Sequence, residues 1–116
     1  MENLNIVKGH HAKTGNEREF IDGSVRSTVL LRSCVVGLGT YNPGWMWSAH
    51  AGKQTGKPSE NHVGYIVSGK MIIKDSSGAE TEVGPGEAFE VSPDHDAWVV
   101  GNEPCVALDF ISVADK

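Results

Sequence analysis

Short apolar runs separated by turn residues are the feature that most limits how this chain can fold. Apolar and β-branched residues gather in segments 27–41, 62–74 and 105–113, with Gly, Pro, Asn and Asp clusters between them. No segment repeats its apolar residues at the spacing of an amphipathic helix. Turn signals about every 8–12 residues are typical of an all-β sandwich or barrel. The sequence therefore predicts an all-β fold with little helix.

Glycines mark where the predicted strands turn. Segment 62–78 is interpreted as two strands that meet at Ser68-Gly69, followed by a turn at 75–78. Gly84-Pro85-Gly86 predicts a sharp corner, because glycine adopts positive φ angles without steric cost. Pro93 then opens the turn before the next strand.

Length and charge limit the classes of protein to consider. The 116 residues suit one domain, 1–116, with a core at about 27–113 and an N-terminal extension at 1–26. The net charge is −5 and Lys and Arg occur singly, so neither nucleic acid nor an anionic membrane surface is the expected partner. The chain has no apolar run of roughly 20 residues and no apolar signal core. We therefore expect a cytoplasmic protein.

Cys34 and Cys105 each lie in a strand-like apolar segment. Two cysteines do not make a disulfide framework, and neither has an adjacent cation or histidine to activate it. We expect both to be reduced thiols in the core.

The motifs "HVGYIVSGKMII" (62–73) and "GPGEAFEVSPDHDAW" (84–98) resemble those of the cupins, and the resemblance covers roughly residues 40–111. It implies a single-domain jelly-roll β-barrel, also called a double-stranded β-helix, whose interior can hold a ligand. Cupins commonly pair through their sheets, so the resemblance also implies a homodimer. Trp45 and Trp47, which share one face of an expected strand at 44–50, are the candidate contact.

The metal motif of the cupins is altered in this chain. His62 stands where the family has a glutamate, while Gly56 and Pro58 stand at the histidine pair. Ala97 stands near the position of the remaining family histidine. Asp94 occupies the place of a usual glycine, and Asp is among the few residues that tolerate the left-handed region.

Three other histidines offer a rebuilt site at the edges of these motifs. His50, His62 and His95 could hold a divalent metal (Zn, Fe, Ni, Mn or Cu) with an open position. Asp94 or Asp96 could orient an imidazole, and Glu60 could be a fourth ligand. The alternative is that each histidine only bonds a backbone carbonyl and that both aspartates are turn residues.

The sequence is consistent with two functions. The first is a small barrel that binds a divalent metal, a small polar organic molecule or both, without catalysis or with an unknown reaction. The alternative is a metal-dependent cupin enzyme, dioxygenase- or isomerase-like, acting on a small polar substrate. In either case we expect the polar segment 51–61 to form a mobile loop over the barrel mouth.

Overall fold

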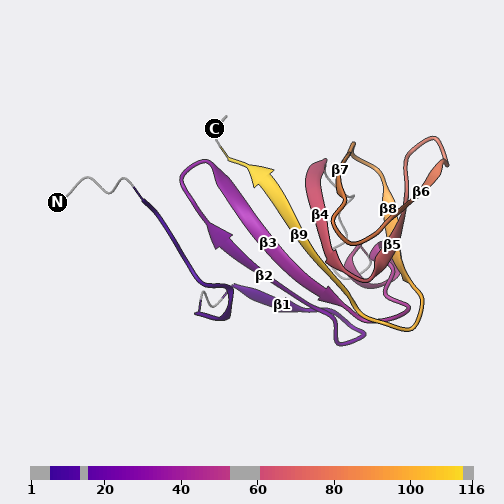
Figure 1. The fold of residues 1–116 in the computed structure, drawn as a ribbon, viewed down its shortest axis with the longest axis horizontal. Coiled ribbons are helices and arrows are strands. Elements are labelled where there is room, and N and C mark those ends of the chain that lie inside the picture. Colours follow the sequence, from indigo (N-terminus) through magenta and orange to yellow (C-terminus); the bar gives the residue numbers. More distant parts are fainter. Residues whose placement is uncertain (1–5, 14–15, 53–60, 114–116) are drawn as a thin grey trace.

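The computed structural model describes residues 6–13, 16–52 and 61–113 (Figure 1). Its elements in chain order are η1 (His11–Lys13), β1 (Glu17–Glu19), β2 (Val25–Leu30), β3 (Cys34–Tyr41), η2 (Trp47–Gly52), β4 (His62–Ser68), β5 (Lys70–Lys74), β6 (Glu80–Val83), β7 (Ala88–Val91), β8 (Asp96–Val100) and β9 (Cys105–Ser112). The prediction of an all-β fold with little helix is confirmed. Within the described ranges, no helix combines the length and apolar character needed to cross a membrane.

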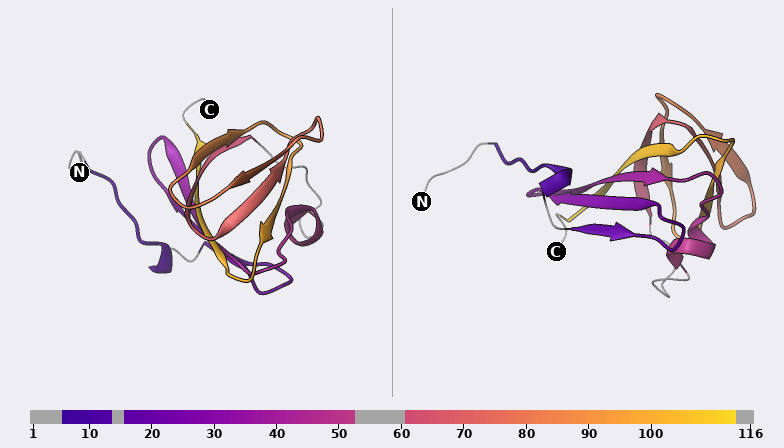
Figure 2. Two further views of the ribbon diagram at one scale, coloured as in Figure 1. Left: turned by 45° about the vertical axis from the view of Figure 1, so that its right-hand side comes forward. Right: turned by 90° about the horizontal axis from the view of Figure 1, so that it is seen from below.

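The described strands form two antiparallel sheets. The six-stranded sheet has the order β1-β2-β3-β9-β4-β7, and the three-stranded sheet has the order β6-β5-β8. Figure 2 shows the strands curving round one another, while the β1–β2 side of the larger sheet extends beyond the barrel. Since β3 and β4 both pair with β9, the last strand joins the two halves of the larger sheet.

The predicted turns form where the sequence placed them. Gly69 separates β4 from β5 at φ 78°, and a side chain there would collide with the Pro104 carbonyl oxygen. At the 84–86 corner only Gly86 takes a positive φ, 84°. Asp94 has φ 65° and is the only described residue other than glycine with a positive φ. This outcome confirms that Asp94 adopts the left-handed region.

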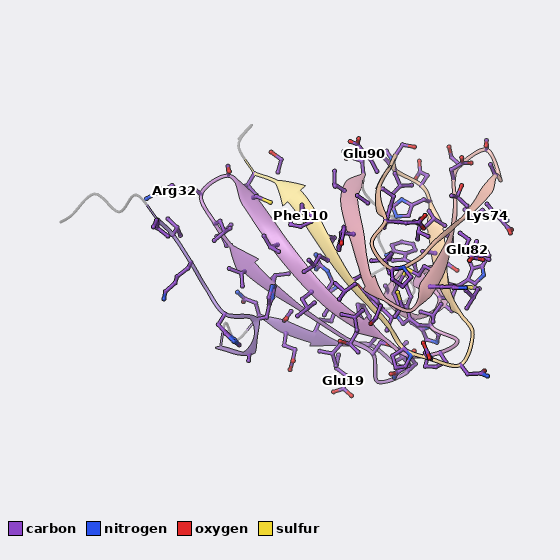
Figure 3. All side chains as sticks on the ribbon, viewed as in Figure 1. Glu19, Arg32, Lys74, Glu82, Glu90 and Phe110 are labelled. Carbon is purple, nitrogen blue, oxygen red and sulfur yellow. The ribbon has the colours of Figure 1, made fainter. Side chains whose placement is uncertain are left out.

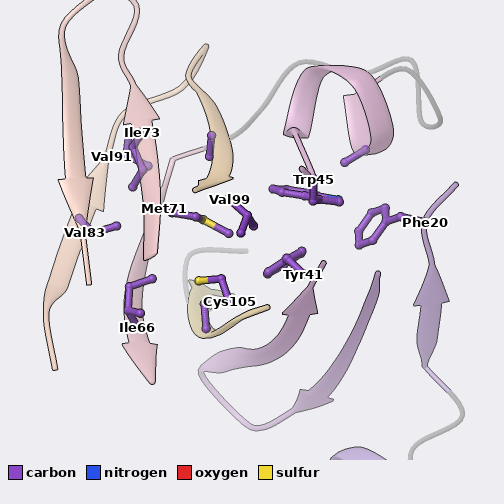
Figure 4. Packing of buried hydrophobic residues seen from close by; sticks show 13 residues of the cluster. Phe20, Tyr41, Trp45, Ile66, Met71, Ile73, Val83, Val91, Val99 and Cys105 are labelled. Atoms are coloured by element: carbon purple, nitrogen blue, oxygen red, sulfur yellow. The ribbon is translucent and has the colours of Figure 1, made fainter. Parts of the chain in front are cut away.

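The core lies between the two sheets. One face of the six-stranded sheet, called the inner face below, contributes Tyr41, Ile66, Cys105 and Ala107. Figure 4 shows Met71 and Val99 of the smaller sheet packed near Cys105. The remaining buried members are Phe20, Trp45, Ala51, Ile73, Val83, Val91 and Ala97. Strand alternation therefore buries one row of each sheet against the other.

The expected strand at 44–50 is wrong. The chain turns after Tyr41, and residues 47–52 form a short π-helix beside β8. Trp45 is 4% exposed, with its ring centroid 4.4 Å from that of Tyr41 and 5.8 Å from that of Phe20 (Figure 4). Tertiary packing of this aromatic group overrides the local strand preference. Trp45 is part of the core, so the two tryptophans do not form an exposed strand face for a partner.

The fold begins earlier than residue 27. β1 and the start of β2 precede it, and Phe20 is 5% exposed within the core. Further upstream, Gly9 lies against the Val29 side chain, and His11 Nδ1 is 3.2 Å from Ser27 Oγ. Residues 17–19 and 25–26 are therefore part of the sheet, and Phe20 is part of the core.

Candidate functional site

His95 lies in the turn that leads into β8 and is 7% exposed. Two residues on, Ala97 is also buried, so both share the inward side of that strand. The His95 Nδ1 atom is 2.9 Å from the Ser92 carbonyl oxygen. A carbonyl oxygen only accepts, so Nδ1 carries the proton and the neutral ring has its lone pair on Nε2. This tautomer suits a metal ligand or a hydrogen-bond acceptor.

His50 has the opposite arrangement. Its Nδ1 accepts a hydrogen bond from the Met46 backbone N–H at 3.0 Å. The proton of the neutral ring is therefore on Nε2. With Nδ1 engaged and Nε2 protonated, neither nitrogen offers a lone pair to a metal. His50 fits the role of tying the first turn of η2 to Met46, and it does not fit the predicted role of a ligand.

The other predicted ligands are only partly described. The backbone of His62 begins β4 opposite Val91, but its side chain lies outside the described part of the chain. Glu60 and most of the predicted loop, 53–60, also lie outside it. Within the described ranges, no group of three His, Cys, Asp or Glu side chains could hold a metal ion. The structure therefore does not assemble the three-histidine site from described side chains.

The Asp96 side chain links η2 to β8 through hydrogen bonds. Its Oδ1 accepts hydrogen bonds from the backbone N–H groups of Ser48 and Ala97, both at 2.9 Å. These contacts match the turn and capping roles of a short acidic side chain rather than the orientation of an imidazole.

An open polar groove of about 380 Å³ lies beside this turn. Residues from η2, the β5–β6 turn and the turn before β8 line it: Trp47, Ser48, Lys74, Asp75, Ser76, Ser77, Gly78, Asp94, His95 and Asp96. The Asp75 carboxylate accepts hydrogen bonds from its own turn: its Oδ1 accepts from Ser77 Oγ at 2.6 Å and from the Ala79 N–H at 3.1 Å. The Ser77 hydrogen bond is the main reason that the pKa of Asp75 lies below its usual value.

The inner face also carries an ion pair that the sequence analysis did not single out. Arg26 on β2 donates from Nε to Asp109 Oδ2 at 3.0 Å and from Nη2 to Asp109 Oδ1 at 2.6 Å. The Arg26 side chain is 26% exposed and that of Asp109 is 16% exposed. Paired hydrogen bonds of this kind are the strongest form of carboxylate recognition in proteins. The pair is thus rigidly held, yet it is accessible.

Glycines in β3 make this pair geometrically possible. Arg26 must cross β3 to reach Asp109 on β9, and β3 presents Gly37 and Gly39 at this point. A Cβ atom on Gly37 would lie 2.5 Å from Asp109 Oδ1 and 2.6 Å from Arg26 Nη2. A Cβ atom on Gly39 would collide with the Tyr41 ring. The Arg26, Asp109 and Tyr41 side chains therefore lie directly against the backbone of Gly37 and Gly39, which is called the floor of the inner face below.

Burial alters the ionisation of this group. Burial lowers the pKa of Arg26, but the hydrogen bonds and charge of Asp109 outweigh this effect and raise it. Burial, followed by the negative charge of Asp109, raises the pKa of Tyr41 well above its usual value. Burial also raises the pKa of Cys105 to about 11. Near neutral pH the inner face therefore holds a charged pair beside a neutral phenol and a neutral thiol.

Two sequence signals could have pointed to the pair. Asp109 is the only charged residue in the strand "CVALDFIS" (105–112), and the segment "VVGLGTY" (35–41) places two glycines on one strand face. An isolated carboxylate in an apolar strand needs a partner. The identity of that partner depends on strand register, which the sequence alone does not provide.

Comparisons with known proteins agree with the fold. A family model described as the EutQ-like cupin domain matches residues 44–105, more than half of the chain. No curated protein matches the sequence. Three solved structures illustrate the likeness: KdgF from Halomonas sp., an uncharacterized conserved protein with a double-stranded β-helix domain from Klebsiella pneumoniae, and the polyketide cyclase RemF from Streptomyces resistomycificus.

KdgF matches with a TM-score of 0.61 and 19% identity, covering 83% of this chain and 84% of that chain. The Klebsiella protein matches with a TM-score of 0.59 and 20% identity, covering 84% of this chain and 79% of that chain. RemF matches with a TM-score of 0.64 and 18% identity, covering 92% of this chain and 79% of that chain. At such identities the likeness concerns the fold alone. The strand pattern, the barrel and the family match lead to one conclusion: this chain belongs to the EutQ-like cupin domain family.

Proposed function

We propose that this cupin domain binds a small polar organic molecule in the interior of its barrel, against the inner face of the six-stranded sheet. The observation that carries the proposal is the Arg26–Asp109 pair, which is fixed by two hydrogen bonds but still partly exposed. Ligand sites typically combine apolar walls with a few well-placed polar groups. The pair supplies charge and hydrogen bonds, and the glycines of β3 allow its side chains to lie directly against the backbone.

The surroundings of the pair support this proposal. Tyr41 packs over Gly39, and Phe89 packs over Gly64, the residue opposite Asp109 on β4. Aromatic side chains therefore lie on both sides of the ion pair along the inner face. Aromatic rings beside a fixed polar group are suited to a ligand with both apolar and polar surfaces.

Spectroscopy of the wild-type protein can test this proposal. Polar compounds of different classes, such as glycerol, lactate and glycine, are added to about 10 mM, which detects millimolar affinities. Binding should shift the backbone amide signals of Gly37, Gly39 and Gly64 more than those of Gly78, a residue in the distant β5–β6 turn. If none of the compounds moves the three inner-face glycines selectively, the proposal fails.

A divalent metal held through His95 is the second candidate. Its support is the His95 tautomer, in which Nδ1–H faces a carbonyl and the lone pair is on Nε2. His62 remains the expected second ligand, whereas the geometry of His50 argues against the third. If bound, Zn, Fe, Ni, Mn or Cu would supply a Lewis acid. In that case the protein would also suit the enzymatic alternative, a metal-dependent reaction on a small polar substrate.

Metal analysis of three matched variants can test the second candidate. We expect His95→Ala and His62→Ala to lose bound metal after loading, because one lost ligand greatly weakens a small site. His50→Ala should keep full occupancy. A wild-type protein that takes up no metal under any loading condition would eliminate this candidate without affecting the first.

A further inference from the structure

We infer that the polar molecule bound by this barrel carries a carboxylate group, and that Arg26 and Arg18 bind that group at the β1–β2 side of the inner face. This inference rests on the proposed function and specifies the chemical class of its ligand.

One edge of the Arg26 guanidinium is not used by Asp109. Asp109 accepts from Nε and from one N–H of Nη2. Nη1 and the second N–H of Nη2 make no hydrogen bond or ion pair with any other described residue. These two groups form a second fork on the end of the guanidinium, with the spacing of two carboxylate oxygens. Because Asp109 fixes the plane of the guanidinium, this second fork is already oriented for a ligand.

Arg18 lies directly opposite Arg26 in the β1–β2 ladder. Side chains directly opposite in an antiparallel pair share a face, and like charges in that position destabilise the sheet. Arg18 is exposed and has no ion pair or hydrogen bond with the described residues. A ligand anion between the two arginines would relieve their repulsion.

The charge of this group favours an anion with one negative charge. Arg18 and Arg26 contribute two positive charges and Asp109 contributes one negative charge, so the group has a net charge of +1. One carboxylate neutralises it, whereas a dianionic phosphate would leave an excess negative charge in a protein that already carries −5. The neighbouring residue Thr28, half-buried opposite Gly37, offers a hydroxyl for a further polar group of the ligand.

Acetate and acetamide are the probes for the wild-type protein, because they match in shape and differ in charge. Signals from the Arg26 Nε–H group and from the Gly37 and Gly39 amides are followed by heteronuclear NMR at constant ionic strength. We expect acetate to shift these signals with at least about tenfold higher affinity than acetamide, since the bidentate charged contact is lost in the amide. Equal affinities, or tighter binding of acetamide, would overturn the inference.

Substitutions of the two arginines test which side chains bind acetate. Arg26→Lys keeps the positive charge but has no fork, and it should weaken acetate binding about tenfold or more. Arg18→Gln should weaken it about threefold, as expected for an exposed charge. Lys70→Gln, which removes one partner of the exposed Lys70–Glu82 pair on the other sheet, should leave it unchanged. An Arg18→Gln variant that binds acetate as well as wild type would contradict the two-arginine site even if Arg26→Lys unfolds.

The outcomes also separate this inference from the proposed function. Glycerol or another neutral compound could shift the inner-face glycines while acetate and lactate do not. That result would overturn the carboxylate assignment and leave the small-molecule proposal standing. Failure of every compound to shift these glycines would overturn both.

Discussion

The two faces of the six-stranded sheet are built from the same strands, but only the inner face carries an ion pair among the described residues of β2, β3, β4 and β9. The inner face carries the Arg26–Asp109 pair over glycine backbone. On the outer face, β3, β9 and β4 present a continuous uncharged surface: Val36, Leu38, Val63, Tyr65, Val67, Val106, Leu108 and Phe110. Figure 3 labels Phe110 along β9, far from the charged Lys74 and Glu82 of the smaller sheet. Alternation along the strands, with a register shift between Ile66 and Ser68 in β4, places the ion pair on one face and these uncharged side chains on the other.

The largest expected effect on stability comes from removing the negative charge of the Arg26–Asp109 pair on the inner face. Asp109→Asn leaves the half-buried Arg26 without its carboxylate. The free energy of unfolding should fall by about 3 kcal/mol, as for one partner removed from a largely buried pair. Urea denaturation measures this change. The matched exposed pair provides the control: Glu82→Gln, which removes the 3.8 Å contact with Lys70, should cost less than about 1 kcal/mol. A similar small cost for Asp109→Asn would show that the inner pair is no more important than the surface pair.

We propose that the outer face packs against the same face of a second copy, which gives the expected homodimer a surface other than the tryptophans. Val63, Tyr65 and Val67 are 40%, 39% and 48% exposed in one chain. An uncharged surface can pack against its own copy across a twofold axis, and large exposed apolar patches mark contact sites. Sedimentation at micromolar concentration should therefore give twice the 12.4 kDa chain mass.

A charge placed on that face should break the dimer. Tyr65→Lys is expected to sediment as a monomer, because each interface would contain two unpaired charges. Leu30→Lys is the matched control, since Leu30 is 65% exposed but lies opposite Val35 on the inner-face rows. A monomeric wild type, or a Leu30→Lys variant that dissociates while Tyr65→Lys does not, would contradict this surface.

A smaller effect is expected from filling the floor of the inner face. Gly37→Ala places a methyl group within 2.5–2.8 Å of Asp109 and Arg26 atoms, so the pair must move. We expect a loss of about 1–3 kcal/mol, typical of overpacking, together with weaker acetate binding. Gly84→Ala is the control, because its nearest neighbours would lie at 3.7 Å and 3.9 Å. Equal thermal stability of the two variants would show that the floor tolerates a side chain.

The smallest expected effect is a loss of stability in alkaline solution. Burial raises the pKa of Cys105 from 9.0 to about 11, and it raises that of Tyr41 as well. Between pH 9 and pH 11 the Cys105 thiol of the unfolded chain releases a proton that the folded chain keeps, so ionisation of this thiol favours unfolding. The contribution of Cys105 is therefore full below about pH 9 and, after allowance for solvent screening, should fall by roughly 1–2 kcal/mol as the pH approaches 11. Cys105→Ala should flatten this dependence in chemical denaturation, whereas Cys34→Ala, at a half-buried thiol, should not.

Local sequence signals predicted the strands well where a backbone requirement fixed the turn. Gly69 and Asp94 both adopt positive φ angles, and the two strands that meet at Ser68-Gly69 and the turn before β8 form as expected. Segment 44–50 was mispredicted because its aromatic residues favour strands locally, while Trp45 is drawn into the core by Phe20 and Tyr41. Its burial leaves the Trp45 Nε1–H without a hydrogen-bond partner among the residues that the structure describes.

The candidate site was harder to predict, because its residues meet only through tertiary structure. Arg26 and Asp109 are 83 positions apart, and their contact depends on the registers of β2, β3 and β9 together. The histidines were visible in the sequence, but their tautomers depend on backbone neighbours that only folding supplies. For this reason His50 and His95, which the sequence alone does not distinguish, differ in which ring nitrogen carries the proton.

The bridge from Arg26 to Asp109 has a consequence for how the sheet opens. Two glycines in the middle of β3 provide little side-chain packing, so β3 by itself is a weak strand. The Arg26–Asp109 pair joins its two neighbours directly, above that weak strand. Neither β2 nor β9 can then peel away without breaking the charged contact. The amide hydrogens of β2, β3 and β9 should exchange with solvent as one cooperative unit, with the glycine-containing strand protected as strongly as its neighbours.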